Sequence, residues 1–93
     1  MFIYLLEVEL LLEDCYSLKD KRRIIRSILD YARDQLKISS CEISNHDTYN
    51  LTRLGFVTIS NQRNLAKDML EQWLERIISY YPVQLQHYII EER

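Results

Sequence analysis

The segment SLKDKRRIIRSILDYARDQLK, residues 17–37, predicts a long amphipathic helix, because it contains no glycine or proline. Its apolar side chains recur at three- and four-residue steps and so form one stripe; they are Leu18, Ile25, Ile28, Leu29, Ala32 and Leu36. Ser17 begins the helix, since its hydroxyl can accept a hydrogen bond from the amide three residues on, and Asp20 suits the positive end of the helix dipole. The apolar stripe needs a surface to cover, which the flanking segments supply.

Three segments around this helix are predicted to be strands. Residues 2–12 alternate with period two and are dominated by aliphatic side chains. Residues 38–44 follow the helix with a similar alternation, and residues 54–60 come after a polar loop over residues 45–53. In this third strand the residues expected to face inward are Gly55, Val57 and Ile59.

A second helix is predicted over residues 62–80, where apolar side chains again recur at helical spacing. Ser60 or Asn61 can cap its start, and Pro82 ends it, because a proline disfavours helical geometry in the residue before it. A last strand follows over residues 83–91.

The alternation of these segments predicts an α+β fold in one domain that spans residues 1–93. Each helix has a single apolar stripe, so we expect both to cover the same side of a four-stranded antiparallel sheet. This arrangement is the ferredoxin-like βαββαβ sandwich, with the strands in the spatial order 4-1-3-2. Because the fold hosts many unrelated functions, function has to be argued from particular residues.

The chain of 93 residues contains one glycine and one proline. Glycine-rich phosphate loops, the dinucleotide-binding fingerprint and the nucleophile turn of hydrolases each need two or more glycines, so these sites are excluded. So few points of backbone freedom favour a rigid scaffold, in which residues 45–53 are the candidate mobile loop.

The cysteines and the apolar segments bear on the compartment. Cys15 and Cys41 lack the paired spacing of metal sites, so we expect two reduced thiols in a cytoplasmic protein. The first seven residues lack the basic lead of a signal peptide. No apolar run reaches 18 residues, and we therefore expect no membrane association.

The predicted helix over residues 17–37 is strongly basic. It carries seven basic and three acidic residues, a net charge of +4; the whole chain has a net charge of −2, so the remaining 72 residues sum to −6. Opposite the apolar stripe, one arc of about 100° holds Lys19, Arg22, Arg23, Arg26, Arg33 and Lys37. A basic helix face can bind phosphates, and the contacts we expect are Lys19, Lys21, Arg22, Arg23, Arg26 and Arg33. The alternative is a solvated face, since an amphipathic helix must point its polar residues outward.

The side of the predicted sheet without helices is half apolar. The residues expected there are Ile3, Leu5, Glu7 and Glu9 from the first strand, Leu54, Phe56 and Thr58 from the third, and Tyr88 and Ile90 from the last. One aromatic ring beside two carboxylates is a poor platform for stacking RNA bases. A half-apolar surface is more typical of a protein contact, so we expect a homodimer that pairs these faces through Leu5, Phe56 and Tyr88.

Residue types with catalytic chemistry are scattered along the chain. His46 beside Asp47 in the loop is more typical of a turn than of acid–base catalysis, and His87 lies within the last strand. Glu7 and Glu9 share a strand face about 7 Å apart, with no nearby histidine to complete a metal site. We therefore expect no enzymatic activity, no metal and no cofactor.

The string SLKDKRR at residues 17–23 resembles the YlxP-like family, bacterial domains of unknown function 503. The resemblance begins at residues 8–10 and resumes later in the chain, at Glu42-Ile43, Asp47, Leu54-Gly55 and Ser60. We expect Asp47 to shape the loop over residues 45–53. The resemblance implies a ferredoxin-like fold without established enzymatic activity. It also implies an accessory role, because genes of the family often lie beside those for translation initiation and ribosome maturation. The sequence departs from the family in the acidic residues 13–16 and at Tyr49, where tryptophan is usual.

Three functions are therefore weighed. The leading one is a cytoplasmic, non-enzymatic protein that associates with the ribosome or with structured RNA through the basic helix face. The alternative is a homodimeric protein-interaction module with no nucleic-acid partner, in which the helix charges serve solubility. The third is a regulatory domain that binds a small anion.

Overall fold

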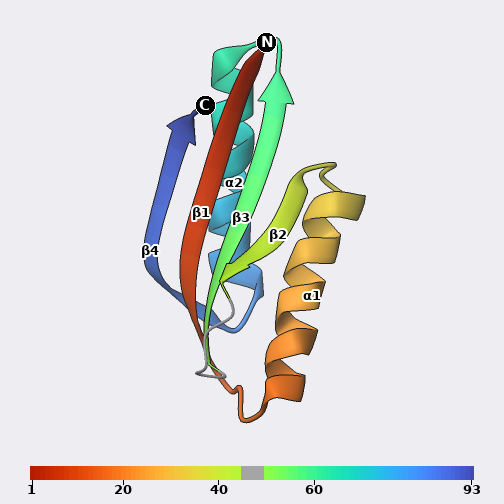
Figure 1. Cartoon of the computed structure of the whole chain (residues 1–93), viewed down its shortest axis with the longest axis vertical. Coiled ribbons are helices and arrows are strands. Elements are labelled where there is room, and N and C mark those ends of the chain that lie inside the picture. Colours follow the sequence, from red (N-terminus) through yellow and green to blue (C-terminus); the bar gives the residue numbers. More distant parts are fainter. Residues whose placement is uncertain (45–49) are drawn as a thin grey trace.

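Within residues 1–44 and 50–93, which the computed structural model describes, strands and helices follow one another in the predicted order. The elements are β1 (Phe2–Leu12), α1 (Leu18–Asp34), β2 (Ser39–Ser44), β3 (Leu51–Ser60), α2 (Arg63–Tyr80) and β4 (Val83–Glu92) (Figure 1). Asp47, which was expected to shape the loop between β2 and β3, lies outside the described residues.

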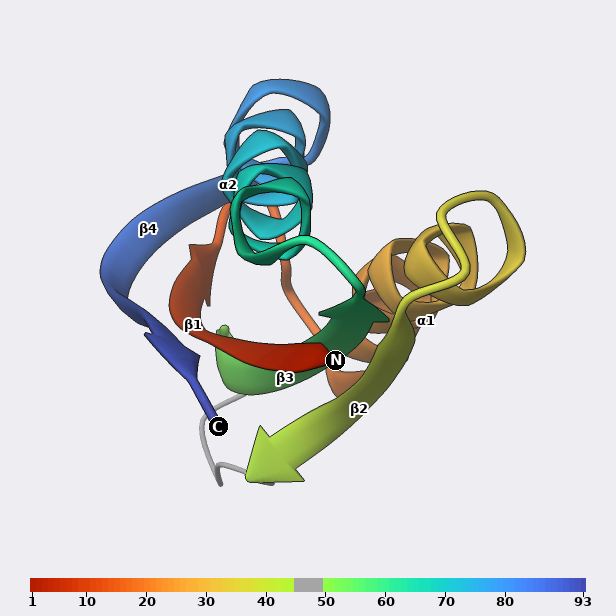
Figure 2. The same ribbon diagram turned by 90° about the horizontal axis from the view of Figure 1, so that it is seen from above.

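The strands form one antiparallel sheet in the order β2-β3-β1-β4, which confirms the predicted spatial order. β1 is central and pairs with β3 on one side and with β4 on the other. Both described helices lie on the same side of this sheet (Figure 2). The fold is therefore the ferredoxin-like α+β sandwich, and the side of the sheet away from α1 and α2 is called the open face below.

Ser17 caps α1 as predicted. Its backbone is extended, with φ −158° and ψ 166°, and its hydroxyl accepts a hydrogen bond from the Asp20 amide at 3.1 Å. The helix ends at Asp34 and not at residue 37 as predicted. Lys37 adopts a left-handed φ of 57° and turns the chain toward β2. Glycine usually marks such a turn; here a lysine makes it, so the residue type does not reveal the end of the helix.

α2 begins at Arg63, one residue later than predicted, and the side chain of Gln62 before it makes no capping hydrogen bond. Ser60, one of the two predicted caps, accepts a hydrogen bond from the Gln62 amide at 3.0 Å and so organises the turn that leads into the helix. Pro82 lies between the end of α2 and the start of β4, as predicted.

β3 faces the opposite way from the prediction. It begins at Leu51, and its buried side chains alternate along the strand; they are Thr52, Leu54, Phe56 and Thr58. Val57 and Ile59, which were expected inside, are 36% and 61% exposed. Each alternating set of this strand contains large apolar side chains, so hydrophobicity does not choose between them. The pairing with β1 does, because Phe56 lies opposite the fully buried Leu6.

The core lies between the sheet and the helices and is centred on Trp73 of α2. The Trp73 ring stacks on Tyr31 of α1, with 5.6 Å between the ring centroids, and meets the ring of Phe56 edge-on at 5.8 Å. Alternate residues of β1 over residues 4–12 are buried on the same side. This packing holds the inner side of α1 in place and leaves its outer side in solvent.

Candidate nucleic-acid interface

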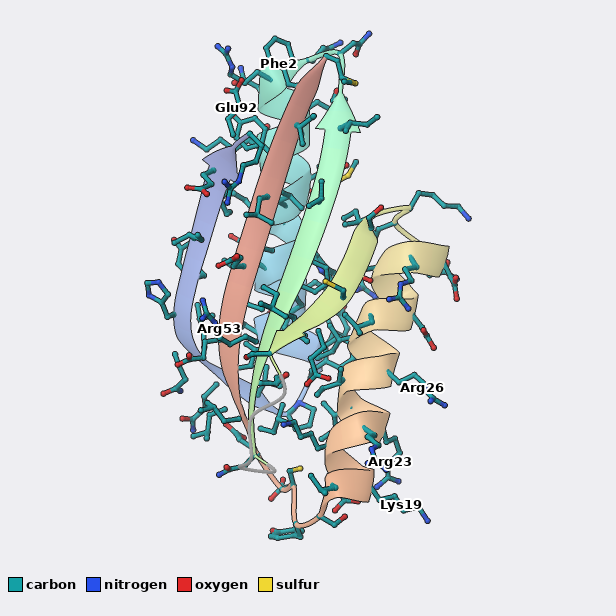
Figure 3. The ribbon with its side chains drawn as sticks, viewed as in Figure 1. Phe2, Lys19, Arg23, Arg26, Arg53 and Glu92 are labelled. Carbon is teal, nitrogen blue, oxygen red and sulfur yellow. The ribbon has the colours of Figure 1, made fainter. Side chains whose placement is uncertain are left out.

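The outer side of α1 carries basic side chains that point away from the sheet (Figure 3). Together with Ser27 and Asp30, four of them line a shallow surface depression of about 500 Å³; the four are Lys19, Arg22, Arg23 and Arg26. All four are exposed, and they span about 10 Å along the helix axis at 1.5 Å per residue. These four residues are called the basic face below.

Three of the four cations have no ion-pair partner in the part of the chain that the structure describes. Lys19, Arg22 and Arg26 make no ion pair with any residue among 1–44 and 50–93. Arg23 pairs with Asp20 at 2.7 Å, three residues away on the same helix. An exposed pair of this kind contributes about 0–1 kcal/mol, so it opens readily for a stronger ligand. The basic face is therefore available to an anionic partner.

Arg33, another predicted contact, lies apart from this cluster and is used within the protein. Its guanidinium donates to the Ser40 carbonyl at 2.6 Å and lies 3.8 Å from a carboxylate oxygen of Asp30. The Ser40 hydroxyl donates in turn to the Leu29 carbonyl at 3.1 Å. These bonds tie the end of α1 to β2, and Arg33 does not line the depression.

Lys21 is buried, with 2% of its surface exposed, so its expected role as a phosphate contact was wrong. At about 100° per residue, Lys21 falls on the same side of the helix as Ile25, Ile28 and Ala32, all of which are buried. The helical periodicity alone therefore predicts that Lys21 is buried, unlike its basic neighbours. The prediction was wrong because it grouped Lys21 with the charged residues next to it in the sequence.

The other candidate residues do not assemble into a chemical site. Cys15 is buried and Cys41 exposed, and neither forms a disulfide. Within the described part of the chain, no three histidine, cysteine or acidic side chains lie where they would hold a metal ion. Neither α1 nor α2 combines the length and apolarity that a bilayer crossing requires. His46 and Asp47 lie outside the described residues.

The three residues predicted to form a dimer surface do not share a face. Leu5 lies on the open face, but Phe56 is fully buried in the core because β3 is turned over. Tyr88 lies opposite Val8 and so on the helix side of the sheet, at its edge. A bulge places an extra residue, Gln86, between the partners of Glu9 and Leu10, which shifts the alternation of β4 by one.

The apolar side chains of the open face differ from the predicted ones, because turning β3 over brings Val57 and Ile59 onto it in place of Leu54 and Phe56. Ile43 lies above Gly55: a Cβ atom built there would be 3.1 Å from two side-chain carbons of Ile43. Gly55 was expected to face the core, and its missing side chain instead makes room for Ile43 on the open face. The resulting apolar patch consists of Ile3, Leu5, Ile43, Val57 and Ile59.

Two comparisons with known proteins match nearly the whole chain. The model of the family described as "Protein of unknown function (DUF503)" matches residues 3–90. The chain is also 30% identical over 78 residues to the uncharacterized protein YlxP of Bacillus subtilis (strain 168). The aligned residues cover 84% of this chain and 85% of that protein. Both findings agree with the resemblance carried by the SLKDKRR string.

Proposed function

This chain belongs to the DUF503 family of proteins of unknown function, and from that premise we propose that it is a non-enzymatic accessory protein that docks on structured RNA, ribosomal RNA included, through the basic face of α1. The observation that carries the proposal is a set of cations along one exposed side of a helix, Lys19, Arg22 and Arg26, which form no ion pair with the described residues. An arginine guanidinium can donate two parallel hydrogen bonds to one phosphate, and the counterions released from the RNA add to the affinity.

The distribution of charge favours an oriented contact over indiscriminate binding. Residues 17–37 carry a net charge of +4 and the rest of the chain −6, so the surfaces away from α1 are repelled by a polyanion as a whole. RNA therefore approaches this protein with one preferred orientation.

Base stacking on the sheet, a common way for sheets of this topology to bind RNA, has no support here. Phe56, the aromatic residue expected on the open face, is buried, and Tyr88 lies on the other side. Two carboxylates, those of Glu7 and Glu9, remain on the open face. The expected contact is therefore with phosphates along the helix.

Co-sedimentation with purified ribosomal subunits at varied ionic strength tests the proposal. Three or four phosphate contacts predict a slope of log affinity against log salt of roughly −3, which is a loss of about 60-fold between about 50 and about 200 mM salt. The triple variant Arg22→Glu, Arg23→Glu, Arg26→Glu is expected to lose co-sedimentation at all these concentrations.

A second triple variant changes the net charge by the same amount at other exposed sites: Arg63→Glu, Lys67→Glu, Arg93→Glu. Their side chains are 58%, 53% and 57% exposed and take part only in surface ion pairs and, for Arg63, a ring contact with Phe2. This control is expected to sediment with the subunits nearly as the wild type does. Wild-type protein that stays in the supernatant at low salt, or equal losses in both variants, contradicts the proposal.

A second candidate function is a protein-interaction module with no nucleic-acid partner, in which the charges on α1 serve solubility. The apolar patch on the open face is the observation that favours it, since monomeric proteins rarely expose large contiguous apolar surfaces. The same sedimentation experiment separates the two candidates, because this module would remain in the supernatant at every salt concentration.

A further inference from the structure

The open face is laid out in rows that run across the strands, because residues paired in an antiparallel sheet point to the same side. On the two central strands, the rows are Ile3 with Ile59, Leu5 with Val57, Glu7 with Gly55, and Glu9 with Arg53. No described helix covers these rows (Figure 2). The face therefore has an apolar end and a charged end on the same two strands.

The apolar end of the open face exposes large side chains to solvent. Ile59 is 61%, Ile43 42% and Val57 36% exposed, and they are contiguous with the half-buried Ile3 and Leu5. Ile43 reaches this surface because Gly55 leaves room beneath it. Three β-branched side chains exposed together on a flat surface are typical of a protein contact.

The charged end is unbalanced within one chain. Arg53 on β3 lies across from Glu9 on β1, yet its guanidinium pairs with Glu7 at 3.4 Å. Glu9 is half-buried and makes no ion pair among residues 1–44 and 50–93. Arg53, labelled in Figure 3, keeps 37% of its side chain exposed. Among the described residues, a half-buried carboxylate without an ion pair and an arginine with spare donors thus lie side by side.

We infer that a second copy of this chain covers the open face, related to the first by a two-fold axis that runs along the strands between β1 and β3. This rotation places β3 of each copy over β1 of the other at the same height. Ile59 then meets Ile3 of the second copy, Val57 meets Leu5, and Arg53 meets Glu9, and each contact occurs twice. The outer strands follow the same rule, so Cys41 on β2 meets Ile89 on β4 of the second copy.

Charge complementarity is what selects a second copy as the occupant. One surface supplies both an arginine and a carboxylate that forms no ion pair with the described residues. The two lie in the same row at equal distances from the axis, which is the requirement for an isologous contact. The size also suffices: with strands about 4.8 Å apart and a rise of about 3.3 Å per residue, the face covers roughly 600 Å² before side-chain relief. Two such faces bury roughly 1,200 Å² in total, more than the about 1,000 Å² that a biological interface needs.

This dimer has its helices on the outside, because the sheets face one another. The two basic faces then lie on opposite outer surfaces and remain accessible. The inference therefore holds whether or not α1 binds RNA, and its tests need no RNA.

Sedimentation equilibrium of charge-reversed variants tests the crossed pairs. Glu9→Arg alone places two arginines against each other at both crossed contacts, and Arg53→Glu alone places two carboxylates there. Each variant is expected to raise the dissociation constant of the dimer about 100-fold or more. An equimolar mixture of the two variants is expected to dimerise again, because only the mixed dimer restores an arginine against a carboxylate at both contacts.

The mixing experiment also controls for damage to the fold, since a misfolded variant does not recover on mixing. Wild-type protein that is monomeric up to about millimolar concentration, a range that covers weak association, overturns the inference. So does a mixture that remains monomeric although each variant unfolds at a temperature similar to that of the wild type.

The apolar end is tested with Ile59→Lys, and Leu65→Lys on α2 is its matched control. The two residues are 61% and 51% exposed, but only Ile59 lies on the open face. We expect Ile59→Lys to be monomeric and Leu65→Lys to dimerise as the wild type does. Equal behaviour of the two variants contradicts the inference.

Cys41 provides a reporter of the dimer that the natural sequence already contains. It is the exposed thiol of the two, and Cys15 is buried. At concentrations where the dimer forms, alkylation of Cys41 is expected to be at least about tenfold slower than in Ile59→Lys, because the second copy covers the thiol. The same rate in both proteins overturns the arrangement of strands proposed above.

Discussion

Lys21 lies in the first turn of α1 with its side chain among the buried residues, whereas Lys19, two positions earlier, is exposed. A lysine can cover apolar surface with its four-carbon stem while its ammonium group keeps a polar contact. The two lysines thus have the same chemistry but differ in burial. Substituting each of them compares a buried with an exposed lysine within one turn of the helix.

We predict that Lys21→Ala lowers the free energy of unfolding by about 1–3 kcal/mol, because it removes buried packing and the polar contact of the ammonium group. Lys19→Ala is expected to change the same quantity by less than about 0.5 kcal/mol. Urea denaturation followed by circular dichroism measures both. If the two substitutions cost the same, the burial of Lys21 is not what sets its role.

Gly55 is a second residue whose role comes from its neighbour. The one glycine of the chain does not have a positive φ, so its backbone conformation is open to other residues. What favours glycine is the narrow space above it, where Ile43 lies 3.1 Å from the position of a Cβ atom. A larger residue at this position would require the Ile43 side chain to shift.

At the scale of elements, α1 and α2 begin in different ways. Ser17 caps α1 with its hydroxyl, and the Tyr16 amide donates to Asp20 at 3.2 Å, so that the first turn is bonded in both directions. Gln62 before α2 makes no such bond. The start of α2 therefore depends on the packing of residues such as Ala66 and Leu70, both buried, and the start of α1 on its cap.

We predict that Ser17→Ala lowers the free energy of unfolding by about 1 kcal/mol, within the usual range of about 0.5–2 kcal/mol for a lost cap. Ser79→Ala is the control, because that hydroxyl donates to the Glu75 carbonyl within α2 and caps no amide. It is expected to change stability by less than about 0.5 kcal/mol. Thermal denaturation of both variants decides the point, and equal midpoints argue against a capping role for Ser17.

At the scale of the whole molecule, the two candidate surfaces lie on opposite sides of the fold. The basic face is on the outer side of α1, and the apolar patch is on the side of the sheet that neither α1 nor α2 covers (Figures 2 and 3). Since the sheet and the core separate them, a substitution on one surface has no direct contact with the other.

We predict that the two surfaces can be disabled separately. Ile59→Lys is expected to keep co-sedimentation with ribosomal subunits within about twofold of the wild type, because additive effects are the rule for distant sites. Arg22→Glu, Arg23→Glu, Arg26→Glu is expected to keep the dimer. Parallel measurement of both properties in both variants checks this, and a variant that loses both properties shows that the surfaces are coupled.

Much of the architecture follows from local patterns. The alternation in β1, the apolar stripe of α1 and the cap at Ser17 predict the order and type of the elements, because periodicity and capping depend on residues close in sequence. The helix-covered sheet follows from the two amphipathic helices, and the exposed cations of the basic face follow from the arc opposite the stripe of α1. The end of α1 was misplaced, since Lys37 makes a turn that glycine usually signals.

Which side chains of β3 and β4 point toward the core depends instead on contacts between distant segments. Both sides of β3 carry large apolar side chains, and a shift of one residue moves every side chain to the other face. Only the pairing of Phe56 with Leu6 beneath Trp73 therefore chooses the side. In β4 the unpaired Gln86 reverses the alternation after Leu85. The basic face could thus be read from one helix, whereas the apolar patch exists only once three strands are paired.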